Sequence, residues 1–266
     1  LLIPLVLSIV LIVFSIGLRT TLDDLLFMFR HPRLLGRSML SIYVIVPIAS
    51  ILLTFVFSVP PYTRLLLIAL AVSPIPPILP VKQEKTGAKS RYAVSLLATA
   101  SLLALIFTPL LLSLASNLLG EHARIAVGQI AKPLFVSTEI PLFAGVLVCR
   151  FAPRWADAAQ ALVLKAGLFL LMAGSGAIFV VQLPAIIRLI GDGTVIAMAI
   201  TVCVGLVAGH LLGGPVERDS AALALASATR HPGVALAIVS TNMPDTMQEA
   251  MAACLLFFVV NLALTI

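Results

Sequence analysis

The sequence predicts an all-α protein, a polytopic bundle of membrane-spanning helices. Of its 266 residues, 61% are hydrophobic and 11% are charged, and the mean hydropathy is +1.17. The apolar residues form long continuous runs, whereas a transmembrane β-barrel would show short alternating segments. Two of the runs, one in each half of the chain, are interrupted by prolines and charged residues. Paired interruptions of this kind are typical of a transporter's binding site.

Nine apolar segments are long enough to span a bilayer, for which a helix needs about 20 residues. They lie at about 1–18, 38–58, 63–82, 91–117, 126–149, 158–182, 193–214, 219–241 and 247–266. Residues 19–37 mix charged and apolar side chains, which predicts a short amphipathic helix on the membrane surface. The odd number of spans indicates a ten-helix plan that lacks its first helix.

Lysine and arginine are abundant in every second connection between these segments. The richer side holds Arg19, Arg30, Arg33, Arg37, Lys85, Lys89, Arg91, Arg150, Arg154 and Arg218. The poorer side holds Arg64, Arg124 and Arg188. The positive-inside rule places the richer side in the cytoplasm. We therefore expect a multi-pass protein of the plasma membrane whose C-terminus is cytoplasmic.

The positive net charge of +6 does not indicate nucleic-acid binding, because the basic residues lie in short loops where membrane topology explains them. The three cysteines, Cys149, Cys203 and Cys254, are far apart and lack the spacing of a metal site or a disulfide framework. We expect no metal and no cofactor. The expected partners are the lipid bilayer and a small molecule.

The first interruption is a proline-rich stretch at residues 73–80, which contains Pro74, Pro76 and Pro77. A polar run that begins at Lys82 follows it. One interpretation is a helix end followed by a cytoplasmic loop, and the other is a discontinuous helix with a short polar second half.

Two hydroxyl residues, Ser95 and Thr99, follow one helical turn apart in the next span. Their side chains could line the same cavity or bond back to their own helix.

The second interruption is the run Arg230, His231, Pro232 and Gly233, near the middle of an apolar span. A cation at this depth costs roughly 2.5–3.5 kcal/mol on insertion scales, and Pro232 releases backbone carbonyls of the preceding turn. Arg230 therefore either binds substrate or coupling ions, or has a structural role, holding those carbonyls or pairing with Glu139. His231 is either a proton acceptor or a packed polar residue. The small residues of 221–228 would let another helix approach closely.

Glu139 is the one acid at a comparable depth. Lys132 lies seven residues before it, on nearly the same helix face, so the two could form an ion pair. The alternative is that Glu139 carries protons. Lys132 and Lys165 lie near helix ends, where their ammonium groups can reach the interface.

Several segments resemble the bile acid:sodium symporter family. They are FSIGLRT at residues 14–20, the proline-rich break with the helix after it, and ATRHPGVALA at residues 228–237. The resemblance implies one transporter domain over 1–266, built from two inverted repeats at about 1–120 and 121–266. It also implies a panel domain, a core domain, and two discontinuous helices that cross near the bilayer midplane.

The chain departs from the family pattern where that family binds sodium. The resemblance implies that oxygen atoms from both crossing helices hold the ions, and Ser95 and Thr99 fit two hydroxyl positions. Lys82 stands in place of an asparagine, Ala226 of a glutamate, Arg230 of a glutamine and His231 of an asparagine. An arginine offers only donors, so the sodium sites should be lost. Arg230, alone or with Lys82, would instead act as a fixed positive charge.

The sequence therefore favours a secondary active or facilitative transporter of an organic anion, either bile-acid-like or a small carboxylate, that works by alternating access without sodium. Protons are the candidate coupling ion, through His231 or Glu139. One alternative is a sensory or binding module of the same fold that has lost transport. The other is a membrane-embedded enzyme acting on lipid-linked substrates, which the scarcity of deep acids and the scattered histidines disfavour.

Overall fold

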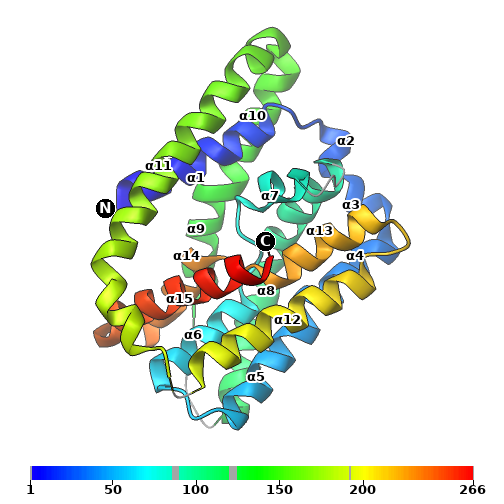
Figure 1. The fold of residues 1–266 in the computed structure, drawn as a ribbon. Helices are drawn as coiled ribbons and strands as arrows, with labels where there is room; N and C mark the ends of the chain where they lie inside the picture. The colour runs from blue at the N-terminus through cyan, green and yellow to red at the C-terminus, as the bar shows by residue number, and fades with distance from the viewer. Residues whose placement is uncertain (1, 86–89, 120–124, 192, 266) are drawn as a thin grey trace.

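The computed structural model describes residues 2–85, 90–119, 125–191 and 193–265, and these form a polytopic bundle of helices (Figure 1). The predicted fold class is confirmed. Lys89 and Arg124, two of the basic residues from which the membrane orientation is predicted, lie outside the described residues.

The helices follow one another in this order: α1 (Leu2–Gly17), α2 (Leu22–Leu25), α3 (Phe27–Arg30), α4 (Pro32–Leu40), η1 (Ser41–Ile45), α5 (Val46–Val56), α6 (Pro61–Val72), α7 (Leu79–Lys85), α8 (Ser90–Leu119), α9 (Val127–Leu134), η2 (Phe135–Glu139), α10 (Ile140–Phe151), α11 (Pro153–Arg188), α12 (Thr194–Leu212), α13 (Glu217–Ala228), α14 (Pro232–Asn242), η3 (Pro244–Thr246) and α15 (Met247–Thr265). The segments η1 and η2 are π-helical turns, and η3 is a 3₁₀ turn.

Within the described residues, seven helical stretches are long and apolar enough to cross a membrane, and α1 and α6 are shorter apolar helices. Each of the nine predicted spans overlaps one of these stretches. Four of these stretches combine more than one labelled helix. In some of them a π-turn continues the helix, and in others a short break interrupts a helix that then continues through the bundle. Pro32–Val56 and Glu217–Asn242 are examples of the two cases.

One group of helices consists of α1, α10 and α11, which pack along one another on one side of the bundle (Figure 1). Their axes approach closely because glycines lie at the contacts. A Cβ on Gly17 would lie 2.9 Å from the Cα of Gly145, and a Cβ on Gly167 would lie 2.8 Å from Ile12. No larger residue fits at the first of these contacts unless the backbones move apart.

A second group contains the two interrupted helices, together with α5, α8, α12 and α15 (Figure 1). Here α12 packs against α13 through Gly205, Gly209 and Gly213, which recur every four residues. A Cβ on Gly205 would lie 2.6 Å from the Ser227 carbonyl oxygen. The predicted close approach to the small residues of 221–228 is confirmed, and its partner is this glycine stripe.

The surface segment after α1 differs from the predicted single amphipathic helix over 19–37. Two short helices, α2 and α3, lie there, and α4 is already the start of the next span. A capping box between Thr21 and Asp24 begins α2. Pro32, at the first position of α4, starts a new helix because its fixed φ suits that position and its missing N–H is not needed there.

The helix α11 is also longer than the predicted span 158–182. Its 36 residues would extend about 54 Å at 1.5 Å per residue, well beyond a hydrocarbon core of about 30 Å. Hydropathy marks only the apolar part of a helix, and Pro153 begins α11 before that part starts.

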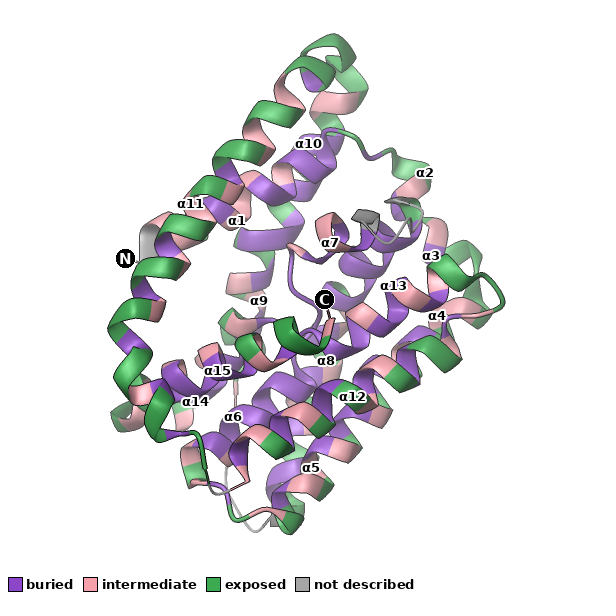
Figure 2. Ribbon diagram, in the orientation of Figure 1, coloured by how far each residue is buried: buried purple, intermediate pink, exposed green. Residues whose placement is uncertain are grey.

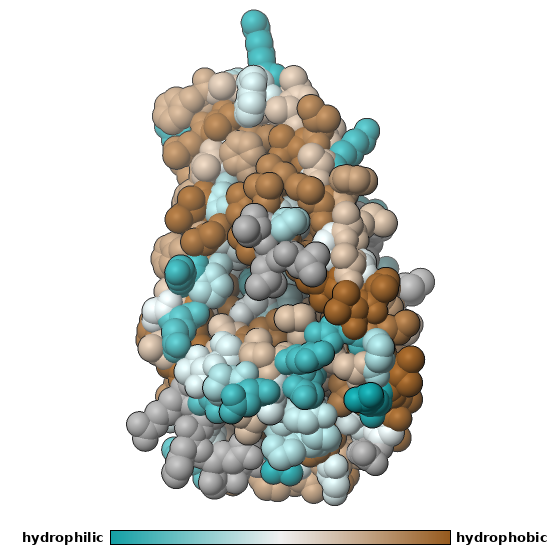
Figure 3. Space-filling model, turned by 90° about the vertical axis from the view of Figure 1, so that its left-hand side faces the viewer, coloured by the Kyte–Doolittle hydropathy of each residue, from teal (hydrophilic) through white to brown (hydrophobic). Residues whose placement is uncertain are grey.

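Burial follows the same division of the molecule. Most residues of α6 and α13 are buried, whereas α11 is largely exposed (Figure 2). Phe169 and Met172 of α11 are 71% and 75% exposed. A broad apolar surface covers the upper part of one face, with polar side chains gathered below it (Figure 3). Exposed apolar helices of this kind are expected where the neighbour is lipid rather than water.

Candidate functional site

The first interruption separates α6, which ends at Val72, from α7, which begins at Leu79. Ser73 has an extended backbone with φ −71° and ψ 153°. Pro74, Pro76 and Pro77 follow it and prevent the helix from continuing, because each lacks an N–H and restricts the residue before it. The discontinuous helix is therefore observed, and the alternative of a simple helix end is wrong.

The second interruption separates α13, which ends at Ala228, from α14, which begins at Pro232. Thr229 and His231 have extended backbones, and Pro232 occupies the first position of α14. The His231 ring caps α14, because its Nδ1 accepts a hydrogen bond from the Val234 N–H at 3.4 Å. Proline and the histidine cap together start the second half of this helix.

The two interruptions contact each other directly. The His231 backbone N–H donates to the Pro74 carbonyl oxygen at 2.9 Å. The Nη1 of Arg230 donates to the Ser73 carbonyl oxygen at 3.2 Å. The predicted crossing of two discontinuous helices is thus present, joined by one main-chain bond and one guanidinium bond.

Each first half-helix also has its last carbonyl covered by a polar side chain. Thr108 of α8 donates to the Val72 oxygen at 2.8 Å, and Asn261 of α15 donates to the Ala228 oxygen at 3.0 Å. Both side chains are buried. Lipid supplies no donor for a free carbonyl. These two hydrogen bonds therefore reduce the free-energy cost of ending a helix inside a membrane.

Arg230 is 1% exposed, and only some of its guanidinium donors are engaged. In the part of the chain that the structure describes, its Nε and Nη2 have no hydrogen-bond partner. The Nε2 of His231 and the Oγ1 of Thr99 are likewise buried without a described partner. Buried donors of this kind are costly unless a ligand engages them. The arrangement can hold an anion at the crossing, and a planar guanidinium suits a carboxylate.

Ser95 is occupied elsewhere. Its hydroxyl donates to the Leu25 carbonyl oxygen at 2.7 Å and accepts from the Met28 N–H at 2.9 Å. The side chain therefore fastens α8 to the surface helices α2 and α3. Lys82 lies on α7, where it is partly buried and interacts with its surroundings.

Glu139 forms neither of the two ion pairs that the sequence suggested. It is 3% exposed, and neither carboxylate oxygen has a partner among the described residues. Lys132 is exposed on α9 instead, as is Lys165 on α11. The pairing prediction fails because the π-turn η2, which ends at Glu139, begins after Lys132. One extra residue in the turn rotates the following residues by about 100°.

Sequence reasoning missed several residues that hold the site. Thr108 and Asn261 are isolated polar residues in apolar spans, and this isolation is the feature of the sequence that could have identified them. Ser41 and Ser227 join η1 to α13 through their hydroxyls at 2.6 Å. Gln83 is buried on α7 and donates to the Ala222 carbonyl oxygen at 2.7 Å.

Comparison with known families agrees with this architecture. The sequence model of the sodium bile acid symporter family matches residues 6–207, about three quarters of the chain. The chain belongs to the sodium bile acid symporter family. A search of curated proteins finds no match.

The symporter family match includes the first interruption and ends before the second. Arg230 and His231 therefore lie outside the matched region. Membership places the chain among multi-pass membrane transporters of small molecules.

Proposed function

We propose that this protein is a carrier for an organic anion, working by alternating access with Arg230 as a fixed cation at the crossing of the two interrupted helices. The supporting observation is the guanidinium itself. It is buried, it is tied to the opposite interruption through Ser73, and its Nε and Nη2 are unpartnered among the described residues.

Sodium has no evident role in this proposal. Sodium requires oxygen ligands, and the second interruption supplies a guanidinium and an imidazole. Two unit charges 4 Å apart repel by roughly 4 kcal/mol at an effective dielectric of 20. A permanent cation at the crossing thus disfavours the binding of a second cation and favours the binding of an anion.

The substrate proposed is a carboxylate, either bile-acid-like or small. A carboxylate can accept two parallel hydrogen bonds from the Nε and Nη2 edge of a guanidinium. The candidate coupling ion is the proton, through Glu139 or His231. Glu139 is buried at the end of the π-turn η2. Protonation of its carboxylate would remove a buried charge that has no compensating partner among the described residues.

The inverted-repeat plan, with halves at about 1–120 and 121–266, is part of the proposal. Its support is the matching pair of contacts at the interruptions. In each half, the span after the interrupted helix covers the last carbonyl of the first half-helix, through Thr108 in one and Asn261 in the other. We also propose the plasma membrane as location and a cytoplasmic C-terminus, from the distribution of basic residues.

Counterflow in proteoliposomes tests this function. Vesicles loaded with an unlabelled carboxylate should accumulate the labelled compound transiently, and a panel of bile acids and short carboxylates would define the substrate class. Binding without counterflow would support the alternative of a transport-inactive sensory module. Turnover of a lipid-linked substrate would support the enzyme alternative.

A further inference from the structure

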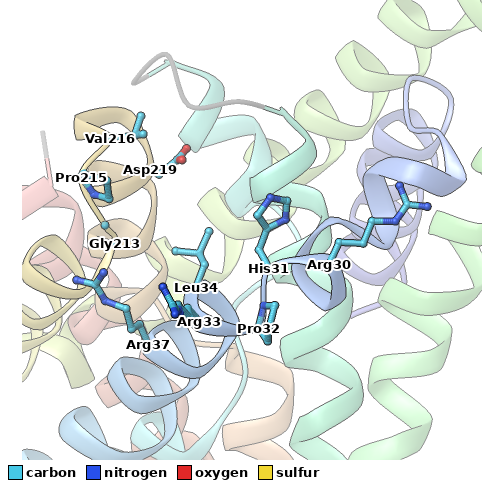
Figure 4. A pocket seen from close by; sticks show the side chains of 11 residues that line it. Arg30, His31, Pro32, Arg33, Leu34, Arg37, Gly213, Pro215, Val216 and Asp219 are labelled. Carbon is cyan, nitrogen blue, oxygen red and sulfur yellow. The ribbon is translucent and has the colours of Figure 1, made fainter.

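An arginine-rich part of the molecule shares no residue with the crossing of the two interrupted helices. A pocket of about 430 Å³ opens between the helices α3 and α4 and the turn that joins α12 to α13 (Figure 4). Its basic lining residues are Arg30, His31, Arg33 and Arg37, and its acidic one is Asp219.

Two of the arginines supply the free positive charge. Arg30 extends away from the others in Figure 4 and forms an ion pair with Asp23 at 2.7 Å. Arg33 and Arg37 lie together below Gly213 (Figure 4). The Nη2 of Arg37 donates to the Leu211 carbonyl oxygen at 3.3 Å, which fixes its guanidinium at the C-terminal end of α12.

His31 adds a rigid edge to the pocket. Its ring stacks on Phe27 with centroids 4.2 Å apart, and its Nδ1 donates to the Phe27 carbonyl oxygen at 2.8 Å. The ring is therefore held in place before any ligand arrives. Arg33 and Arg37 line the same cavity and supply guanidinium N–H donors there.

Exposed apolar side chains occur on the same elements as this basic pocket. Phe29 is 55% exposed, Leu211 is 69% exposed and Val216 is 43% exposed. They belong to the surface helices, to the end of α12 and to the turn after it. A basic pocket at the end of a span, with exposed apolar residues on the same helices, matches a ligand with a charged head and hydrocarbon chains.

We propose that this pocket binds the phosphate headgroup of an anionic phospholipid, with Arg33 and Arg37 contacting the phosphate. Basic pockets between helices at the cytoplasmic surface recognise such headgroups, and a guanidinium forms parallel hydrogen bonds to phosphate oxygens. The bound lipid would join α4 to the turn that precedes α13, the helix that leads to Arg230. The proposal depends on the pocket alone and stands apart from the transported substrate.

Native mass spectrometry of protein released from nanodiscs tests the proposal. The nanodiscs would contain phosphatidylglycerol and phosphatidylcholine in equal amounts. Wild-type protein should retain phosphatidylglycerol selectively. The double variant Arg33→Gln with Arg37→Gln should retain it about tenfold less, since each basic residue near an anionic surface contributes a few-fold. The single variant Arg33→Gln keeps the Arg37 contact with Leu211 and should show an intermediate loss.

Arg154→Gln is the matched control, because Arg154 is an exposed arginine on the same predicted side but on α11. It should retain the lipid as wild type does. Equal retention by the double variant and Arg154→Gln, at unchanged thermal stability, would overturn the proposal. So would equal retention of the two lipids by the wild type. If millimolar inorganic phosphate displaces the lipid and raises the thermal stability as much as phosphatidylglycerol does, the ligand is a soluble phosphate and the lipid assignment is wrong.

Discussion

The side chains that cover the interrupted helix ends provide the sharpest test of how the crossing is held. Thr108→Val keeps the shape of the side chain but removes the 2.8 Å hydrogen bond to the Val72 oxygen. Asn261→Leu removes the 3.0 Å bond to the Ala228 oxygen at nearly constant volume. Each change leaves a carbonyl at a helix end without its donor, in a place that water does not reach.

The expected loss follows from that unpaired carbonyl. Hydrogen bonds between membrane helices contribute about 0.6 kcal/mol on average. A buried polar group left without a partner costs about 1–3 kcal/mol. The second value applies here, because Thr108 and Asn261 are 0% and 1% exposed. We therefore expect each variant to lower the free energy of unfolding by about 1–3 kcal/mol.

Reversible denaturation in detergent or bicelles would measure this loss. Ser240→Ala is the control, since Ser240 makes a similar bond to the Ala237 oxygen at 2.9 Å but is exposed. Its loss should stay below about 0.5 kcal/mol. If Thr108→Val and Asn261→Leu are no more destabilising than Ser240→Ala, the two bonds do not hold the helix ends, and the reasoning about the crossing fails.

Three further changes address the site and the packing around it. Arg230→Gln should weaken carboxylate uptake at least tenfold, because a charge-assisted bond contributes about 1.5–3 kcal/mol; uptake kinetics that match the wild type would remove the role of Arg230. Glu139→Gln should abolish stimulation of uptake by an inward proton gradient, and stimulation that persists would transfer the coupling role to His231. Gly209→Ala should destabilise the fold by about 1–3 kcal/mol, because the added Cβ overlaps the backbone of α13. Gly176→Ala, where a Cβ meets open space, should show no such loss in the same unfolding assay.

Much of the fold could be predicted because membrane helices carry their own signals. A run of about 20 apolar residues is required by bilayer thickness, so all nine spans could be located. A cluster of prolines in one run, and a proline beside a deep arginine in another, marked the interruptions, since a proline removes a backbone bond that lipid cannot replace. Helix ends were less predictable, as α11 shows, because helical structure continues past the apolar region.

The contacts between distant segments could not be predicted from local pattern. Nothing near Pro74 in the chain indicates that its carbonyl bonds to His231, or that Asn261 covers Ala228. The expected Lys132–Glu139 ion pair is not formed, and the cause is a local feature that the sequence shows. Pro141 follows the π-turn η2 as Pro47 follows η1, and a proline deprives the carbonyl four residues earlier of its donor.

The glycine spacing on α12 was also readable. Glycines at 205, 209 and 213 recur at the interval that allows membrane helices to approach closely. The sequence indicated the small side chains on α13 but not this partner stripe. The separate basic pocket required the fold, because its residues come from α3, α4 and the turn after α12.

The initial rate of carboxylate uptake into proteoliposomes, with sodium outside or with choline in its place, tests the central claim most directly. If Arg230 supplies the positive charge at the crossing, the two rates should be equal at matched membrane potential and pH. A rate that requires sodium and saturates with its concentration would contradict the account, because a metal ion would then occupy the place assigned to the guanidinium.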